Sequence, residues 1–508
     1  MDLRLAILGI NPAWQLVLEQ IGTDYQAVQT NEISAAKFAV LIVEDLGSAR
    51  QQVQKFLEAG GNILFSAAAF SQFYTRKMRS KRVRTLYASP ENFFGKLAPL
   101  DLVGKLSLPS STKGLTCQNK GLQIYHGSEK AGQYFILPFD LSQEMQAYRG
   151  QRKKFVAARR ELPSEIVAAN SKAAIRELIT RLLQELYAER ELPFIQKSYI
   201  PAAQRNFCFR VDTDFCSAAE AETLYAICQK HQISASWFVD TKNIKRLQNC
   251  YGKFKDQEIA LHCFRHRVFD DYQANFENLQ NGLINLAIIP EHSAGFAAPF
   301  GSWNFALDRA LNQLSFSYSS EFVLSYDDLP FYPLVSGNSS QVLQIPLHPI
   351  SLGRLRRSHF SPTEMLEYYK NIVSQKAANA EPIIIYHHPH HAHLEVFSHL
   401  FEFLDEQQID NLTLADYADF WRKRLDYPLH AKFVDKQILL ENPDENIELR
   451  IFYRGKLALS KNTKQIKLET LDFRDLVDKR NQHDQLARRY HWRDTLYAYE
   501  SWRGRRNR

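Results

Sequence analysis

The sequence predicts an α/β protein of several domains, and three observations support this prediction. At 508 residues the chain is too long for one ordinary core, since domains average about 150 residues. Short apolar runs alternate with helical patterns in residues 1–145 and again in residues 200–427, which is typical of parallel strands joined by helices. After residue 428 strand-like runs follow one another, separated by turns such as Asn442-Pro443-Asp444.

The first domain, residues 1–145, is predicted to be a doubly wound sheet. Apolar runs at 3–10 and 38–44 are typical of buried parallel strands, and a helical pattern at 49–59 stops at two glycines before a third strand. This layout resembles class I glutamine-amidotransferase-like domains. A working domain of that kind needs a nucleophilic cysteine on a tight elbow, and Cys117 has no flanking glycine. We therefore expect a non-catalytic domain.

The remaining chain divides into three predicted parts. Residues 146–199 form a connecting segment with helical periodicity from Ser164 to Arg190. Residues 200–427 repeat the strand–helix pattern, which suits a barrel or a second doubly wound sheet. Residues 428–508 form a small β module that ends in a tail rich in arginine and aromatic residues.

Composition excludes several classes of protein. Hydrophobic residues make up 45% of the chain and charged residues 23%, as in globular domains. The six cysteines include no CxxC pair, so the spacing indicates neither a zinc knuckle nor a disulfide framework. No run approaches the roughly 18 apolar residues of a membrane span, and the first apolar run is too short for a signal peptide. We therefore expect a cytoplasmic protein.

The C-terminal tail accounts for much of the net charge of +7. Its arginines alternate with tyrosine and tryptophan, a combination that suits nucleic acid, acidic glycans or an anionic membrane surface. A solvated tail, or one that docks on another domain, is the commoner structure for such a charge run. Both alternatives stay open at the level of sequence.

Two carboxylates follow the apolar run 207–211 directly, at Asp212 and Asp214. If the run is a barrel strand, these side chains lie on the face of the barrel that carries active sites. A solvated turn also accommodates Asp-x-Asp, so the pair alone does not establish a site.

Two histidines occupy the equivalent place after the run 258–261. His262 ends the run and His266 follows four residues later, a spacing that lets two imidazoles reach one cation at about 2.0–2.1 Å on a helical turn. Surface histidines would give the same spacing, so this pair also needs support from elsewhere in the chain.

Two further segments have the same position after a predicted strand. The loop 293–301 is rich in small residues, and its backbone N–H groups are free to face a substrate oxygen. The apolar run 382–386 leads into a tract that holds five of the chain's 16 histidines, beginning at His387. Such a tract can be an incidental surface patch, but its place after a buried strand favours a role in lining a site.

Together the four segments resemble carbohydrate esterase family 4, the polysaccharide deacetylases, over about residues 200–425. Segments 210–214 and 261–266 are especially similar to the branch that includes bacterial lipid-linked aminoarabinose deformylase. Pro299-Phe300-Gly301 is similar to the third motif of the family and Ile385-Tyr386-His387 to its closing motif. The resemblance implies a distorted (β/α) barrel for residues 200–427.

The resemblance also implies a catalytic metal centre. Asp214, His262 and His266 would bind a divalent metal ion, Zn²⁺ or alternatively Co²⁺, Ni²⁺ or Mn²⁺. Two imidazoles and one carboxylate leave coordination positions open for water and substrate, which is typical of catalytic sites. The metal would lower the pKa of bound water toward about 7.

Three further roles follow from the same resemblance. Asp212 would be the general base, and His387 the general acid that protonates the departing amine. Each such proton transfer typically contributes about 10²–10⁴ in rate. The backbone N–H of Phe300 would stabilise the oxyanion together with the metal.

The chain departs from the family pattern at Ala297, where relatives carry an arginine that orients the base. Arg210 or Arg265 could supply the missing cation. A second ambiguity concerns the closing motif, because His388 could take the acid role from His387 if the strand register differs.

The expected function is therefore that of a metal-dependent hydrolase that removes an acetyl or formyl group from an amino sugar or glycan precursor. The alternative is a catalytically silent carbohydrate-binding or scaffold protein of glycan biosynthesis that retains the metal pocket, and Ala297 favours it. A third hypothesis, based on the basic tail, is a protein associated with nucleic acid.

Overall fold

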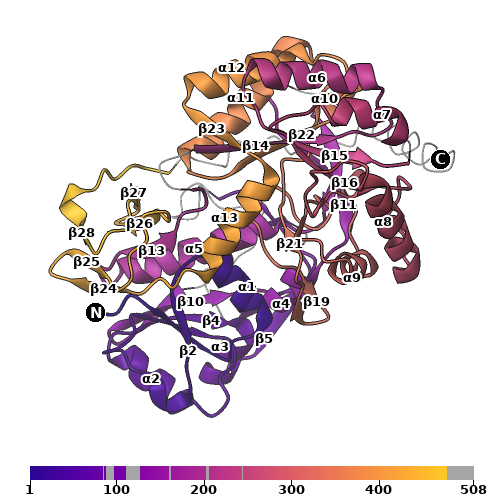
Figure 1. The fold of residues 1–508 in the computed structure, drawn as a ribbon. Helices are drawn as coiled ribbons and strands as arrows, with labels where there is room; N and C mark the ends of the chain where they lie inside the picture. Colours follow the sequence, from indigo (N-terminus) through magenta and orange to yellow (C-terminus); the bar gives the residue numbers. More distant parts are fainter. Residues whose placement is uncertain are drawn as a thin grey trace.

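A computed structural model describes residues 1–83, 85–86, 97–109, 126–159, 162–201, 205–242 and 244–476. Figure 1 shows the N-terminal domain in indigo at the bottom, the (β/α) domain above it and the yellow β module at the left. The predictions made for Cys117 and for the basic tail concern residues outside these ranges. Within them, no helix combines the length and apolar character needed to cross a bilayer.

The N-terminal domain is the doubly wound α/β unit that the sequence predicts. Its six-stranded sheet has the order β2-β1-β3-β4-β10-β9, in which only β9 runs antiparallel. The elements are β1 (Leu5–Leu8), α1 (Pro12–Ile21), β2 (Tyr25–Ala27), β3 (Val40–Val43), α2 (Arg50–Glu58), β4 (Asn62–Ser66), α3 (Ala67–Tyr74), β9 (His126–Glu129) and β10 (Gly132–Leu137). Two short antiparallel pairs follow α3: β5 (Met78–Lys81) pairs with β8 (Leu106–Pro109), and β6 (Thr85–Leu86) pairs with β7 (Leu100–Asp101).

The connecting segment contains strands as well as the expected helix. After α4 (Leu141–Gln146) come β11 (Gly150–Lys154) and β12 (Ser164–Ala168), which pair antiparallel, then α5 (Lys172–Ala188) and β13 (Phe194–Lys197). The helix predicted from Ser164 therefore begins eight residues later, and the β-branched pair Ile166-Val167 lies in a strand, where such side chains fit best. Helix α5 packs on the N-terminal sheet and on β13 and β26.

The central domain is a curled parallel sheet surrounded by helices. The strand order is β21-β18-β17-β16-β15-β14-β22, with β23 also paired to β14. A parallel bridge between His348 and Ile385 brings the chain after β21 back to β22, so the sheet curls toward closure. The strands are β14 (Arg205–Asp212), β15 (Ser236–Asp240), β16 (Glu258–Cys263), β17 (Gly295–Phe296), β18 (Tyr318–Ser319), β21 (Leu343–Gln344), β22 (Ile383–His387) and β23 (Ile409–Leu412).

The helices of this domain are α6 (Ala218–Lys230), α7 (Ile244–Tyr251), α8 (Tyr272–Leu286), α9 (Phe305–Gln313), α10 (Leu352–Arg357), α11 (Pro362–Ala378), α12 (Glu395–Glu406) and α13 (Leu414–Asp426). Side chains of β14 alternate between two cores. Phe207 and Phe209 pack outward against the helices, whereas Cys208 faces the interior cluster with Phe238 and Tyr386. Both faces of each strand are therefore buried, as in other parallel sheets.

The β module pairs with distant parts of the chain. One sheet contains β24 (Ala431–Val434), β25 (Gln437–Leu440) and β28 (Gln465–Lys467), and the other joins β26 (Leu449–Tyr453) and β27 (Lys456–Ser460) to β13. The amide of Leu3 donates to the carbonyl of Ala431 at 3.0 Å, which anchors the first residues of the chain to this module.

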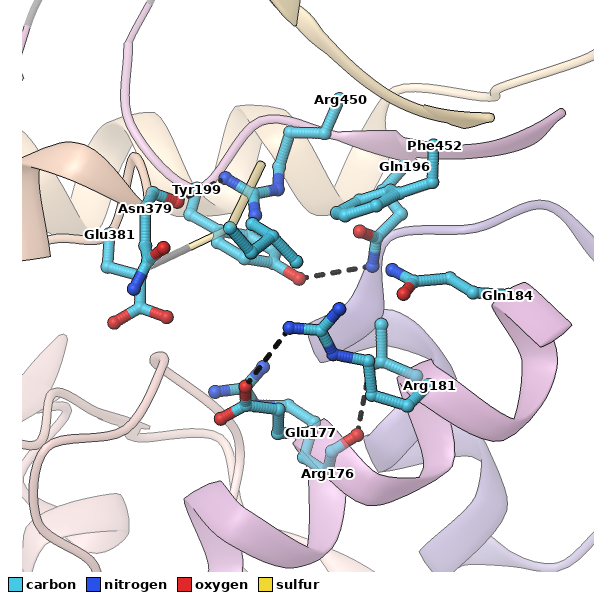
Figure 2. A pocket seen from close by; sticks show the side chains of 12 residues that line it. Arg176, Glu177, Arg181, Gln184, Gln196, Tyr199, Asn379, Glu381, Arg450 and Phe452 are labelled. Atoms are coloured by element: carbon cyan, nitrogen blue, oxygen red, sulfur yellow. Dashed lines mark hydrogen bonds and ion pairs between the residues drawn. The ribbon is translucent and has the colours of Figure 1, made fainter. Parts of the chain in front are cut away.

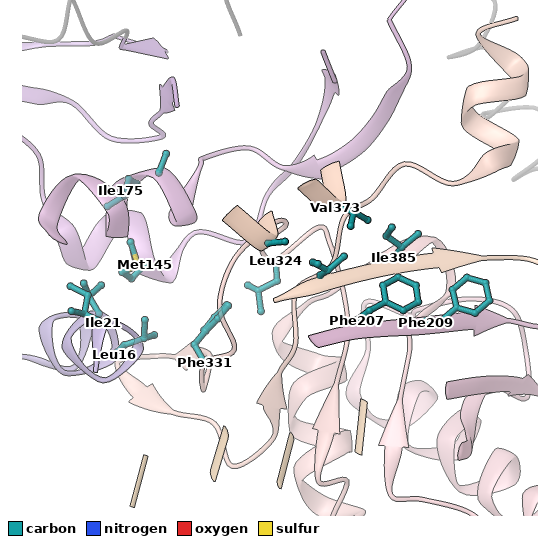
Figure 3. Packing of buried hydrophobic residues seen from close by; sticks show 14 of the residues in the cluster. Leu16, Ile21, Met145, Ile175, Phe207, Phe209, Leu324, Phe331, Val373 and Ile385 are labelled. Atoms are coloured by element: carbon teal, nitrogen blue, oxygen red, sulfur yellow. The ribbon is translucent and has the colours of Figure 1, made fainter. Parts of the chain in front are cut away.

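The three parts share one continuous core. Figure 3 shows Leu16 and Ile21 of α1 and Ile175 of α5 in the same apolar cluster as Phe207 and Ile385 of the central domain. Figure 2 shows the polar side of this junction, where a pocket is lined by residues of α5, β13, β26 and the turn after α11. The shared core fixes the orientation of β14 and β22, which carry part of the site.

Candidate metal centre

Three of the predicted ligands converge at the carboxyl ends of β14 and β16. The Nε2 atoms of His262 and His266 lie 2.8 and 3.0 Å from the same oxygen, Oδ1 of Asp214. The ligand atoms of the three residues all lie within 4.8 Å of one another. His262 is the fifth residue of β16 and His266 lies in the loop beyond it, so the strand aims both imidazoles at the end of β14.

The protonation of His262 is set by its second ring nitrogen. Its Nδ1 lies 2.7 Å from the carbonyl oxygen of Ala297, an acceptor, so Nδ1 carries a proton, and in the neutral imidazole Nε2 carries the lone pair. This Nε2 is buried and has no aligned hydrogen bond among the described residues, although it is close to Asp214. Two lone-pair-bearing atoms this close are stabilised by a cation between them, so the donor set fits a divalent metal such as Zn²⁺.

The electrostatics of the site depend on the surrounding histidines. Burial raises the pKa of Asp214, but the nearby imidazoles of His388, His262 and His266 outweigh burial and hold it well below its ordinary value. Asp240, which ends β15, lies close enough to interact with these groups, and burial raises its pKa. Asp240 is not among the site residues predicted from the sequence, although it follows the strand-like run 235–239 just as Asp212 follows the run 207–211.

Asp212 is held by an arginine from its own strand. Nε and Nη2 of Arg210 each donate a hydrogen bond of 2.7 Å to one oxygen of the Asp212 carboxylate. Arg210 is fully buried, and its guanidinium lies over the rings of Phe238 and Tyr386, 5.4 and 5.7 Å from their centroids. Of the two candidates for the arginine missing at Ala297, the structure places Arg210 on Asp212, whereas Arg265 is exposed.

His388, and not His387, faces the metal centre. Nε2 of His388 lies 3.4 Å from Oδ2 of Asp214. His387 is fully buried against Phe397 of α12, with ring centroids 4.7 Å apart, and burial lowers its pKa well below the ordinary value. The side chains of β22 alternate, and Tyr386 faces the interior, so His387 turns to the helix layer. The expectation that His387 lines the site is corrected to His388.

The third motif forms a tight turn beside His266. Phe300 lies in the 3₁₀ turn Pro299–Gly301 with φ 60°, and its ring centroid is 4.9 Å from that of His266. The N–H groups of Gly301 and Ser302 donate to the carbonyls of Ala298 and Pro299. Within the described part of the chain the N–H of Phe300 has no such acceptor, so it remains able to donate to a substrate oxygen.

Comparisons with known proteins identified similar solved structures only. No family model and no curated protein matches the chain. A structure described as a polysaccharide deacetylase from Mycobacterium smegmatis is 16% identical, covers 45% of this chain and 94% of its own, and has a TM-score of 0.37. A second, from Pseudomonas aeruginosa, is 14% identical, covers 44% and 93%, and has a TM-score of 0.38.

A third similar structure is a carbohydrate esterase family 4 pseudoenzyme from Bacillus anthracis, at 13% identity, 54% and 91% coverage and a TM-score of 0.33. These comparisons give no support to the glutamine-amidotransferase resemblance of the N-terminal domain, which stays a prediction. The family found among the similar structures is the polysaccharide deacetylases, the one that the motifs of residues 200–425 resemble.

Proposed function

We propose that this protein is a metal-dependent amidohydrolase that removes an N-acyl group, acetyl or formyl, from an amino sugar or glycan precursor. The observation that carries the proposal is the convergence of two imidazoles on Asp214 beside an arginine-held carboxylate, Asp212. Two histidines and one carboxylate are a ligand set with open positions, which a hydrolytic site needs and a structural site does not.

Asp214, His262 and His266 would hold the metal, with Zn²⁺ as the leading candidate and Co²⁺, Ni²⁺ or Mn²⁺ as alternatives. When bound, the ion polarises the acyl carbonyl and makes water a stronger nucleophile at neutral pH. The hydrogen bond from His262 Nδ1 to the Ala297 carbonyl keeps that imidazole in the tautomer that ligation requires.

The remaining groups move protons and stabilise charge. Asp212 takes a proton from water as its oxygen attacks the acyl carbon, and Arg210 fixes the carboxylate through both oxygens. The N–H of Phe300 donates to the oxyanion that develops. His388 gives a proton to the sugar nitrogen as the C–N bond breaks, so the products are a carboxylic acid and a free amine. His388 is assigned this role because it is the histidine of the closing segment that lies beside Asp214, 3.4 Å from its Oδ2.

The alternative function is that of a catalytically silent carbohydrate-binding or scaffold protein. The observation that favours it is the alanine at position 297. The bidentate contact of Arg210 with Asp212 weakens that argument, because the base has an orienting cation from its own strand, β14. The cytoplasmic glycan precursor as substrate, and contact of the tail with polyanions, stay predictions.

The test combines metal content with acid release. Purified wild-type protein should contain about one equivalent of divalent metal, and Asp214→Ala should contain almost none. Asp308→Asn, which changes a buried carboxylate in α9 outside the site, is the matched control and should retain the metal. Equal metal in the wild type and Asp214→Ala would refute the ligand assignment.

Acetate or formate release from N-acylated glucosamine oligomers then separates the two functions. Asp212→Asn should retain the metal and lose release by at least about 100-fold, as expected for loss of a general base. Undiminished release in this variant would exclude Asp212 as the base. A wild-type protein that holds metal and releases no acid from any N-acylated sugar would favour the silent alternative.

A further inference from the structure

Two exposed phenylalanines flank the metal centre. Phe215 follows Asp214 in the chain and is 56% exposed, and Phe300 of the third motif is 50% exposed. Of the phenylalanines that the structure describes, only these two are exposed. Their ring centroids lie 5.0 and 4.9 Å from that of His266, so both rings are beside the same ligand.

Both residues have a backbone conformation that bulky side chains rarely adopt. Phe215 has φ 57° and Phe300 has φ 60°, in the left-handed region. This conformation is unfavourable for a bulky side chain and is retained where the surroundings enforce it, commonly at ligand sites. The amide of Cys216 closes a turn on Thr213, and that of Gly301 closes one on Ala298. Two separate segments are thus strained in the same way, and each brings an aromatic ring to the rim.

Shielding of His266 explains only part of this arrangement. The His266 side chain is largely buried, and both rings contribute to covering it. A ring whose only task is shielding would bury its own surface as well, because exposed apolar surface is unfavourable in water. About half of the surface of each residue is exposed to solvent instead, next to the position that the acyl group must reach.

We propose that Phe215 and Phe300 form an aromatic platform on which the apolar face of a pyranose ring stacks. This inference rests on the proposed function and names how its substrate is recognised. A pyranose carries C–H groups on one face and hydroxyls around its edge, so a flat apolar ring with polar neighbours fits it. His388, whose Nε2 lies 3.4 Å from Oδ2 of Asp214, supplies such a polar neighbour. The site therefore recognises the sugar as well as the acyl group, and favours a ring that is presented on an open surface.

The expected strength follows from the buried area. Stacking that removes roughly 60 Å² of apolar surface from water, at about 25 cal/mol per Å², corresponds to about tenfold in affinity per ring. Truncating one ring should therefore raise Kd about tenfold, and truncating both should raise it by about 50- to 100-fold if the two act on the same sugar chain.

The test is equilibrium binding of the N-acetylglucosamine tetramer, measured by calorimetry in the metal-loaded Asp212→Asn background so that turnover does not interfere. Phe215→Ala should raise Kd about tenfold, and Phe215→Tyr, which keeps the aromatic face, should stay within about twofold of its parent. Ile284→Ala is the matched control, since Ile284 is a 66% exposed apolar residue on α8, and it should leave Kd unchanged. A Kd that is the same in Phe215→Ala and its parent would overturn the platform.

Two further outcomes separate this inference from the proposed function. If the wild type releases acid and Phe215→Ala binds the tetramer normally, the platform is wrong and the proposed function stands. If the wild type releases no acid but Phe215→Ala loses tetramer binding, the platform is supported and the proposed catalytic function is refuted. An oligothymidylate is the competing probe, because bases also stack on aromatic rings. If Phe215→Ala loses binding of this probe but not binding of the tetramer, the carbohydrate assignment is overturned.

Discussion

The buried pair Arg210–Asp212 offers the sharpest test of how the site is built. The two hydrogen bonds of 2.7 Å join groups that are almost completely buried, and the guanidinium also donates to the Ser320 carbonyl. Burial lowers the pKa of Arg210, but the adjacent Asp212 outweighs burial and raises it, so the arginine stays charged. Removing either partner therefore leaves the other charge buried and unpaired.

The magnitude follows from that burial. Breaking a buried ion pair by removing one partner costs about 3–5 kcal/mol, whereas replacing both partners leaves no isolated charge. Arg210→Met and Asp212→Asn should each lower the free energy of unfolding within or near this range, and the double variant should lose less than their sum by about 2–3 kcal/mol. Arg210→Met should also reduce acid release by at least about 100-fold, because the base loses its orientation.

Urea unfolding followed by tryptophan fluorescence measures the cycle, since Trp237 lies in β15 beside β14. Arg176→Met is the matched control. It breaks another buried pair, with Asp328 at 3.1 Å, and should lose stability but retain acid release. If the stability losses of the two single variants add up to that of the double variant within about 0.5 kcal/mol, Arg210 does not orient the base. Acid release at the wild-type rate in Arg210→Met would lead to the same conclusion.

Four other variants test three separate parts of the structure. Burial raises the pKa of Glu321 to about 7 from 4.5. The contribution of this side chain to the free energy of unfolding is therefore complete below pH 4.5 and decreases by about 3 kcal/mol as pH rises through 7. The urea midpoint of Glu321→Gln, measured at pH 5 and pH 8, should lack the decrease that the wild type shows. His388→Gln should lose acid release and His387→Leu should keep it, and the reverse result in the release assay would restore His387 as the acid. Gly22→Ala places a Cβ 2.1 Å from Nη2 of Arg424 at φ 77°, and thermal unfolding should show a loss of several kcal/mol; an unchanged midpoint would contradict the close approach.

Local spacing predicted much of the fold and the residues that converge at the candidate metal centre. The alternation of apolar runs with helical patterns predicted both α/β regions, because a strand and the helix after it are each encoded in a few neighbouring residues. Segment 164–168 was assigned to a helix because its apolar residues continue the pattern of α5, and its pairing with β11 is a contact that periodicity does not contain. Asp214, His262 and His266 come together because each lies at the end of a strand or within three residues after one.

Which face of a strand points inward was the information that the sequence analysis lacked. Side chains alternate along a strand, so Arg210 and Asp212 share one face, and Tyr386 and His388 share one face. This period of two favours Arg210 over the loop residue Arg265 as the partner of Asp212. The same period places His387 and His388 on opposite faces of the strand, so only one of them can face the site. It does not identify which one.

The choice between the two faces is hidden because both faces of these strands are buried. In β22 the outward residues Ile383 and Ile385 are as apolar as the inward Ile384, so hydrophobicity gives no direction. The inward face of the strand can be identified only from a polar side chain whose position in the site is already assigned. Asp212 must face the metal centre if it is the base, and the parallel pairing of Val211 with His387 puts these two residues side by side on the outward face. Register and one assigned residue on β14 therefore determine that His388 is the histidine that faces the metal centre.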